Sequence, residues 1–118
     1  MTSIGIFGAN GRMGRALVSV AAEQQLALTA ATVRAGSVLL GQDAGDIAGC
    51  GKLGLALTET DLMALQQAEV WIDFTMPEAM LTHLDLAVAA QKALVIGVTG
   101  LTDAQYAKVQ AASQFIPI

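Results

Sequence analysis

The residues of this chain best suited to chemistry form a glycine-rich turn near the N-terminus, Gly8-Ala9-Asn10-Gly11-Arg12-Met13-Gly14. Gly8 allows the chain to leave a strand sharply, and Asn10 tolerates the positive φ that such turns often need. Without a Cβ, Gly11 lets the backbone approach phosphate oxygens, and Gly14 lets the following helix pack closely on the strand. The turn is therefore typical of a site that holds a dinucleotide pyrophosphate at a helix N-terminus.

The spacing of the three glycines is G-x-x-G-x-x-G, whereas the common dinucleotide-binding motif is G-x-G-x-x-G. Glycine-rich turns are frequent, so a tight strand-to-helix turn without a ligand remains an alternative. The surrounding sequence favours a nucleotide, because an apolar run predicts a strand over Ser3–Phe7 and the next residues predict a helix over Arg12–Gln24.

Composition narrows the classes of protein that this chain can be. Hydrophobic residues make up 54% of its 118 residues and charged residues only 14%, which suits a parallel sheet covered by helices. A net charge of −4 argues against a nucleic-acid partner, and no stretch is long and apolar enough to predict a membrane span. The single Cys50 cannot form an internal disulfide, so we expect a cytoplasmic protein.

Strands and helices are predicted to alternate along the rest of the chain. Strands are expected at Leu26–Val33, Leu55–Leu57, Val70–Phe74 and Ala93–Gly97, and a further strand begins at Phe115–Ile118. Helices are expected at Thr60–Gln67, capped by Thr60, at Pro77–Ala90, and at Asp103–Ser113, capped by Thr102. This alternation predicts an α/β fold with a Rossmann-like, doubly wound parallel sheet.

The segment from Gly36 to Gly54 interrupts this regular order. It contains six glycines and no helical or strand periodicity longer than a few residues. Because it exceeds the usual length of a structureless connection, we expect a functional loop or a mobile one.

Two further strand ends are candidates for cofactor contact, because such sheets bind ligands beyond the carboxyl ends of their strands. The end of one strand continues into Thr75-Met76-Pro77-Glu78, and the end of another continues into Gly97-Val98-Thr99-Gly100. Small residues and hydroxyls at these ends suit a nicotinamide ribose and ring. The alternative is that Thr75 only caps the next helix and that the second segment is only a turn.

The end of the second strand bears on the choice of cofactor. An acidic residue usually stands there and accepts hydrogen bonds from ribose hydroxyls. This chain has Val33 at that place, followed by Arg34, which could pair with a 2′-phosphate. The residues therefore favour NADPH over NADH, although Arg34 could equally be a solvated charge.

No catalytic or metal-binding constellation is found. His83 lies among leucines without a second metal ligand, and we expect a surface or packing residue on a helix away from the strand ends. Asp73 has no evident acid–base partner, and Cys50 has no histidine at a meaningful spacing. The methionines at positions 13, 63, 76 and 80 are predicted to be packing residues.

Four segments together resemble the N-terminal domain of the 4-hydroxy-tetrahydrodipicolinate (dihydrodipicolinate) reductase family. They are Ile6–Arg15, Leu39–Gly45, Ile72–Glu78 and Val95–Gly100, and their order and spacing match throughout the chain. The resemblance implies an NADH- or NADPH-dependent reductase of lysine and diaminopimelate biosynthesis that assembles as a homotetramer. It also implies that Gly8 to Met13 cradle the pyrophosphate, that Phe74 and Thr75 flank the cofactor, and that Gly97 to Thr99 line its nicotinamide end.

The chain also departs from this family. Many members have an acid in place of Val33 and an arginine in place of Met76, which weakens the case for NADH and removes one phosphate partner. The family's catalytic and tetramer-forming parts lie C-terminal to Ile118, so residues 1–118 are expected to be a dinucleotide-binding domain truncated before the substrate domain, and catalytically inactive alone. A nucleotide- or CoA-binding module without reductase activity is the alternative.

Overall fold

A five-stranded parallel sheet runs through the protein, seen in a computed structural model that describes residues 1–118. The strands lie in the order β3-β2-β1-β4-β5, and each pairs in parallel with its neighbours. Their bounds are β1 Ser3–Phe7, β2 Ala27–Val33, β3 Thr58–Glu59, β4 Val70–Asp73 and β5 Ala93–Ile96. The predicted α/β, Rossmann-like, doubly wound sheet is confirmed.

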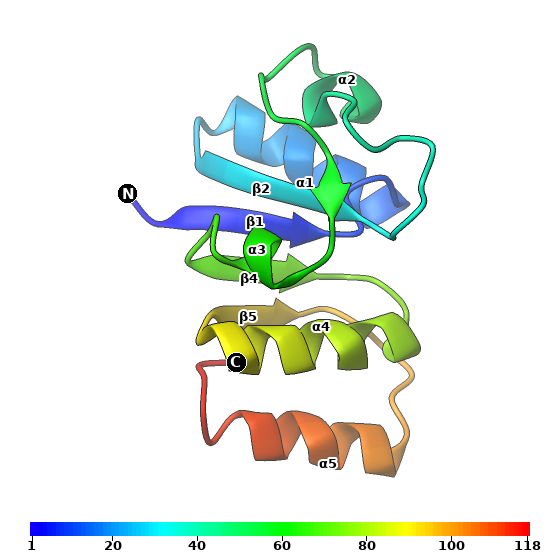
Figure 1. Ribbon diagram of the computed structural model, residues 1–118, viewed down its shortest axis with the longest axis vertical. Helices are drawn as coiled ribbons and strands as arrows, with labels where there is room; N and C mark the ends of the chain where they lie inside the picture. The colour runs from blue at the N-terminus through cyan, green and yellow to red at the C-terminus, as the bar shows by residue number, and fades with distance from the viewer.

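Helices cover both faces of the sheet (Figure 1). They are α1 Arg12–Glu23, α2 Ala44–Ala48, α3 Leu62–Leu65, α4 Pro77–Ala90 and α5 Asp103–Ala112. Buried residues of α1 and α2 pack in one apolar cluster, and those of α3, α4 and α5 pack in another, so the sheet separates two cores. Since the longest helix, α4, has only 14 residues, none of the helices could cross a lipid bilayer.

The helix that follows β4 is placed by its sequence pattern. Pro77 occupies the first helical position, where its missing N–H costs no hydrogen bond. Met80, His83, Leu84 and Ala87 recur at helical spacing and are the buried residues of α4. This stripe fixes α4 against the sheet, and it includes the chain's one histidine.

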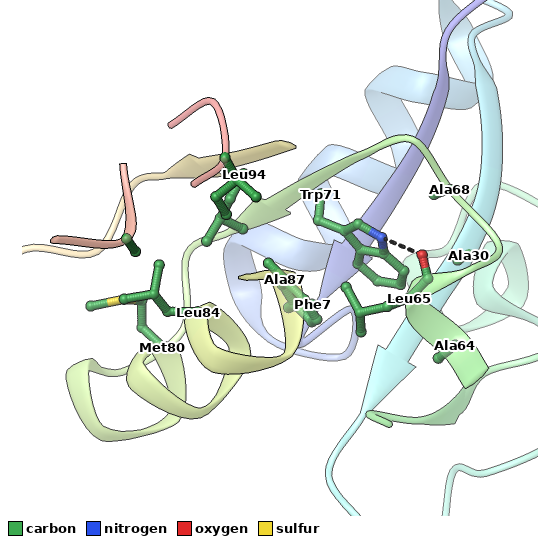
Figure 2. Packing of buried hydrophobic residues seen from close by; sticks show 12 residues of the cluster. Phe7, Ala30, Ala64, Leu65, Ala68, Trp71, Met80, Leu84, Ala87 and Leu94 are labelled. Atoms are coloured by element: carbon green, nitrogen blue, oxygen red, sulfur yellow. Dashed lines mark hydrogen bonds between the residues drawn. The ribbon is translucent and has the colours of Figure 1, made fainter. Parts of the chain in front are cut away.

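Trp71 is the centre of the core on the α4 side (Figure 2). It pairs with Gly5 across the sheet, and a Cβ on Gly5 would lie 2.6 Å from the indole ring. The indole N–H donates to the carbonyl of Leu65 at 3.2 Å, and the ring stacks on Phe7 with centroids 4.5 Å apart. Through Phe7, this core reaches the end of β1, where the glycine turn begins.

Several predicted elements differ in detail. The cap of α3 is Asp61, which accepts from the N–H of Ala64, and the helix is shorter than predicted. The strand expected at Leu55–Leu57 lies slightly later, as β3, because Ala56 instead forms an isolated bridge with Asp43. No strand forms at Phe115–Ile118, although the N–H of Leu94 in β5 donates to the carbonyl of Pro117.

The prediction that residues 36–54 contain no regular structure is wrong, because α2 lies within them. Asp43 caps this helix and also holds the chain that returns past it. Its carboxylate accepts hydrogen bonds from five backbone N–H groups, those of Gly45, Asp46, Leu53, Gly54 and Leu55. Four of these donors, the N–H of Leu53 foremost and then those of Asp46, Gly54 and Leu55, lower the pKa of Asp43 from 3.8 to about 2.

The methionines at positions 13, 63, 76 and 80 were predicted to be packing residues, and of these four only Met80 lies in the core. Met13, Met63 and Met76 are exposed, since each lies at the start of a helix or just before one, outside its buried stripe.

Candidate functional site

The glycine turn between β1 and α1 is closely packed backbone. Gly8 has a φ of 62°, and a Cβ there would lie 2.6 Å from Cγ2 of Thr75. A Cβ on Gly14 would overlap the carbonyl oxygen of Gly8 and lie 2.8 Å from Cα of Ala9. Ala9 is itself buried, and its N–H donates to the carbonyl of Thr32 in β2. The turn is therefore fixed on both sides before any ligand is present.

The start of α1 offers unpaired hydrogen-bond donors. Gly11 is its N-cap residue and supplies no side chain, and the first turn contains no acidic residue. The N–H groups of Arg12, Met13 and Gly14 have no acceptor within the chain. Free N–H groups and the positive end of the helix dipole together attract an anion such as a pyrophosphate.

A cavity of about 370 Å³ opens beside this turn at the carboxyl edge of the sheet. It is bounded by the ends of β1 and β2, the residues after β3 and β4, and the first turns of α4. Its lining residues are Gly8, Asn10, Val33, Arg34, Ala35, Thr60, Thr75, Ala79, Thr82 and His83. The structure thus brings together four residues that were predicted to contact the cofactor: Gly8, Asn10, Arg34 and Thr75.

The lining at the end of β2 is cationic. Val33 is buried, whereas Arg34 is exposed and forms no ion pair with any carboxylate of the chain. No Asp or Glu lines the cavity. An unpaired guanidinium beside a cavity without acids favours an anionic ligand.

A buried carboxylate organises the opposite wall. Asp73, the last residue of β4, accepts hydrogen bonds from the N–H and hydroxyl of Thr75 at 2.8 and 2.5 Å. Its second oxygen lies 2.7 Å from Nδ1 of His83, whose ring stacks on Phe7 with centroids 4.1 Å apart. Asp73 is fully buried, so its oxygens depend on these hydrogen bonds in place of water.

Two expectations about these residues are therefore wrong. Asp73 has a partner, and His83 lies at the strand ends, facing the cavity, although it is buried and packs as expected. The sequence did contain a signal, since His83 is spaced with Met80, Leu84 and Ala87 on the stripe that faces the sheet. Thr75 does not cap α4, because Met76 is the N-cap residue and the Thr75 hydroxyl is bonded to Asp73.

The other predicted contacts lie along the same sheet edge but outside this cavity. A Cβ on Gly97 would overlap the ring of Phe74, and the N–H of Gly97 donates to the carbonyl of Asp73 at 2.8 Å. Val98 is half-buried and Thr99 is exposed. The ends of β4 and β5 therefore form a second surface adjoining the cavity through Thr75.

No group of three His, Cys, Asp or Glu side chains could hold a metal ion.

Comparison with known proteins agrees with the family resemblance. The family model described as "Dihydrodipicolinate reductase, N-terminus" matches residues 2–118. The chain belongs to this family. A 4-hydroxy-tetrahydrodipicolinate reductase of Pseudoalteromonas atlantica is 48% identical over the whole chain, which spans 45% of that relative. One of Acinetobacter baumannii is 44% identical over 98% of the chain and 42% of the relative. The chain thus spans less than half the length of these relatives.

Solved structures share the fold of this family domain. Dihydrodipicolinate reductase from Paenisporosarcina sp. TG-14 matches 98% of the chain and 43% of its own, with a TM-score of 0.60 and 22% identity. An amine dehydrogenase of Mycobacterium smegmatis matches 80% of the chain and 29% of its own, with a TM-score of 0.71 and 19% identity. At these identities the likeness concerns the arrangement of strands and helices alone.

Proposed function

We propose that this chain binds a nicotinamide dinucleotide, NADPH in preference to NADH, and supplies it to the reductase reaction of its family. The observation that carries the proposal is the cavity beside the glycine turn, which is lined by the free guanidinium of Arg34 and by no acid. The unpaired N–H groups at the start of α1 belong to the same glycine turn. The pyrophosphate would lie against Gly8 to Gly14. The adenosine end would extend toward Arg34, and the nicotinamide end toward Phe74, Thr75 and Gly97 to Thr99.

Family membership supports hydride transfer from NAD(P)H to a dihydrodipicolinate-type substrate in lysine and diaminopimelate biosynthesis. A protein with the full length of these relatives would carry substrate-binding residues and, by resemblance, form a homotetramer. Within residues 1–118 we expect no proton donor to meet the charge that develops on the substrate nitrogen, because Nδ1 of His83, on the cavity wall, is bound to Asp73. We expect the chain alone to bind the cofactor without turnover, and an NADPH-oxidation assay with the substrate tests this.

The glycine turn is tested with Gly11→Val. A Cβ on Gly11 meets only the carbonyl oxygen of Gly8, at an ordinary 3.4 Å, so the fold tolerates a side chain there. That side chain would stand where the phosphate approaches, and we expect NADPH binding to be lost in calorimetry while the melting temperature changes little. Unchanged affinity would contradict the placement of the pyrophosphate.

The cofactor preference is tested with Arg34→Ala. Hydrogen bonds to charged groups contribute about 1.5–3 kcal/mol, so NADPH binding should weaken by that amount while NADH binding stays nearly constant. Lys108→Ala removes an equal charge on α5, remote from the cavity, and is the matched control. Equal losses for both cofactors would show that Arg34 does not contact the 2′-phosphate.

The alternative function, a CoA- or other nucleotide-binding module, uses the same fold. It is distinguished by competition, since a nicotinamide site retains bound NADPH when CoA is added. Displacement of NADPH by CoA at comparable concentration would favour the alternative.

A further inference from the structure

His83 has one nitrogen whose partner is known and one whose partner is missing. Nδ1 lies 2.7 Å from Asp73, and a carboxylate can only accept, so Nδ1 carries the hydrogen. Nε2 has no hydrogen-bond partner in the chain and is not among the fully buried unpaired atoms. The side chain keeps 11% of its surface exposed, and His83 lines the cavity. In the neutral ring, Nε2 is therefore a free acceptor that a ligand in the cavity can reach.

The ring is also held in one orientation. Phe7 stacks on it with an interplanar angle of 9°, Asp73 fixes Nδ1, and the buried stripe of α4 fixes the backbone. Asp73 in turn is held by Thr75 through two hydrogen bonds. An acceptor whose direction is set before binding costs little entropy to use.

The cavity lacks the carboxylate that usually accepts from a nucleotide there. In this fold an acid after the second strand ordinarily accepts from the adenosine ribose hydroxyls. Here that position is Val33, whose buried side chain cannot accept, and no carboxylate lines the cavity. Thr60 donates its hydroxyl proton to the carbonyl of Val33, and Thr75 donates its own to Asp73, so both are neutral hydroxyls that keep only lone pairs for a ligand.

We propose that Nε2 of His83 accepts a hydrogen bond from a hydroxyl of the adenosine ribose and so takes over the role of the missing acid. His83 is then a binding residue, and Asp73 is a positioning residue that fixes its tautomer. This inference rests on the proposed nucleotide site. Because a neutral acceptor does not repel a phosphate as a carboxylate would, His83 lets the site keep its ribose contact while accepting a 2′-phosphorylated nucleotide.

Two substitutions test the roles of Nδ1 and Nε2 of His83 separately. In His83→Asn the amide nitrogen replaces Nδ1, so the hydrogen bond to Asp73 persists while the Nε2 end is lost. In His83→Gln a polar atom remains near Nε2, and the bond to Asp73 is lost. One net hydrogen bond corresponds to a roughly three- to tenfold change in affinity, so we expect that loss of NADH affinity in His83→Asn with an unchanged melting temperature. We expect the larger loss of stability in His83→Gln, because it leaves Asp73 without one partner.

The hydroxyl is identified with two NADH analogues, one lacking the 2′- and one the 3′-hydroxyl of the adenosine ribose. Wild-type protein should bind one analogue more weakly than NADH, by the same factor that His83→Asn loses with NADH. His83→Asn should bind that analogue no more weakly than the wild type does, because the missing hydroxyl and the substitution remove the same contact. Additive losses with both analogues, or full NADH affinity in His83→Asn, would overturn the inference. A wild-type chain that bound no nicotinamide nucleotide would instead refute the proposed function, so the two failures are distinguishable.

Discussion

The turn between β1 and α1 holds glycines at positions 8, 11 and 14, and the segment from Gly36 to Gly54 holds six. In the turn, a side chain on Gly14 would overlap backbone atoms of the same turn. In the segment, five of the six glycines have no atom within 4 Å of an added Cβ, yet all five have φ between 77° and 91°. Gly45, whose Cβ would lie 2.6 Å from Leu53, is the exception.

The same residue type thus answers two different needs. At Gly14 the turn uses glycine for space, because helix and strand must approach closely to place N–H groups around a phosphate. At Gly8 it uses glycine both for space and for left-handed backbone. The segment uses glycine for left-handed backbone, and its shape is held by the carboxylate of Asp43. Substitutions should therefore be severe at Gly14 in the turn and mild in the segment, except at Asp43 and Gly45.

The largest effect is expected for Gly14→Ala. The added Cβ would lie 2.8 Å from Cα of Ala9, and neither backbone can move without separating α1 from β1. We expect a loss of about 3 kcal/mol in unfolding free energy, the upper end for overpacking, measured by urea denaturation. Gly11→Ala is the matched control in the same turn and should cost only the N-cap preference for glycine over alanine, about 1 kcal/mol. Equal stability of the two variants would contradict the packing argument.

Asp43→Ala should have the next largest effect, confined to the segment. It removes the acceptor of five N–H groups, so amide exchange should accelerate at Gly45, Asp46 and residues 53–55. Asp46→Ala, one turn away and without a side-chain hydrogen bond, is the control. The mobility predicted from the sequence is tested by the same measurement: rapid exchange at these amides in the wild type would mean that the carboxylate does not order the segment.

Lowering the pH should reproduce part of the effect of Asp43→Ala. The pKa of Asp43 is lowered to about 2 in the folded chain, below the value of about 3.9 for an unperturbed aspartate. Its contribution to stability is therefore complete above pH 4 and is lost as the pH falls toward 2. The difference in unfolding midpoint between wild type and Asp43→Asn should shrink over this range. A difference that stays constant between pH 5 and 2.5 would show that the charge of Asp43 is not what holds the segment.

The sequence predicted the elements whose stability is local. Residue types alone placed α4 at Pro77–Ala90, and the N-cap of α5 at Thr102, whose hydroxyl accepts from the N–H of Gln105. Apolar runs predicted β1, β4 and β5, because strands buried on both faces are continuous hydrophobic segments. The glycine turn was evident because its function imposes residue types at fixed spacing.

The features that the sequence did not predict depend on partners brought together by folding. The order around α2 depends on Asp43 reaching N–H groups up to twelve residues away, which no periodicity records. The pairing of Asp73 with His83 joins a strand end to the second turn of the next helix. It could have been inferred from the stripe of α4, since a histidine facing the sheet beside a buried aspartate needs a polar partner.

Gly49→Ala should give the smallest effect and is the sharpest test of the comparison. Gly49 ends α2 with a φ of 82°, and its N–H donates to the carbonyl of Asp46. An added methyl group meets nothing, so the cost is that of left-handed backbone alone, about 1–2 kcal/mol for an L-residue. Gly49→Asn should recover part of this loss, because asparagine tolerates that conformation and fills the same open space. Equal stability of Gly49→Ala and Gly49→Asn would contradict the role of backbone shape in this segment. So would a loss of stability in Gly49→Ala as large as that in Gly14→Ala, because crowding would then account for the glycine.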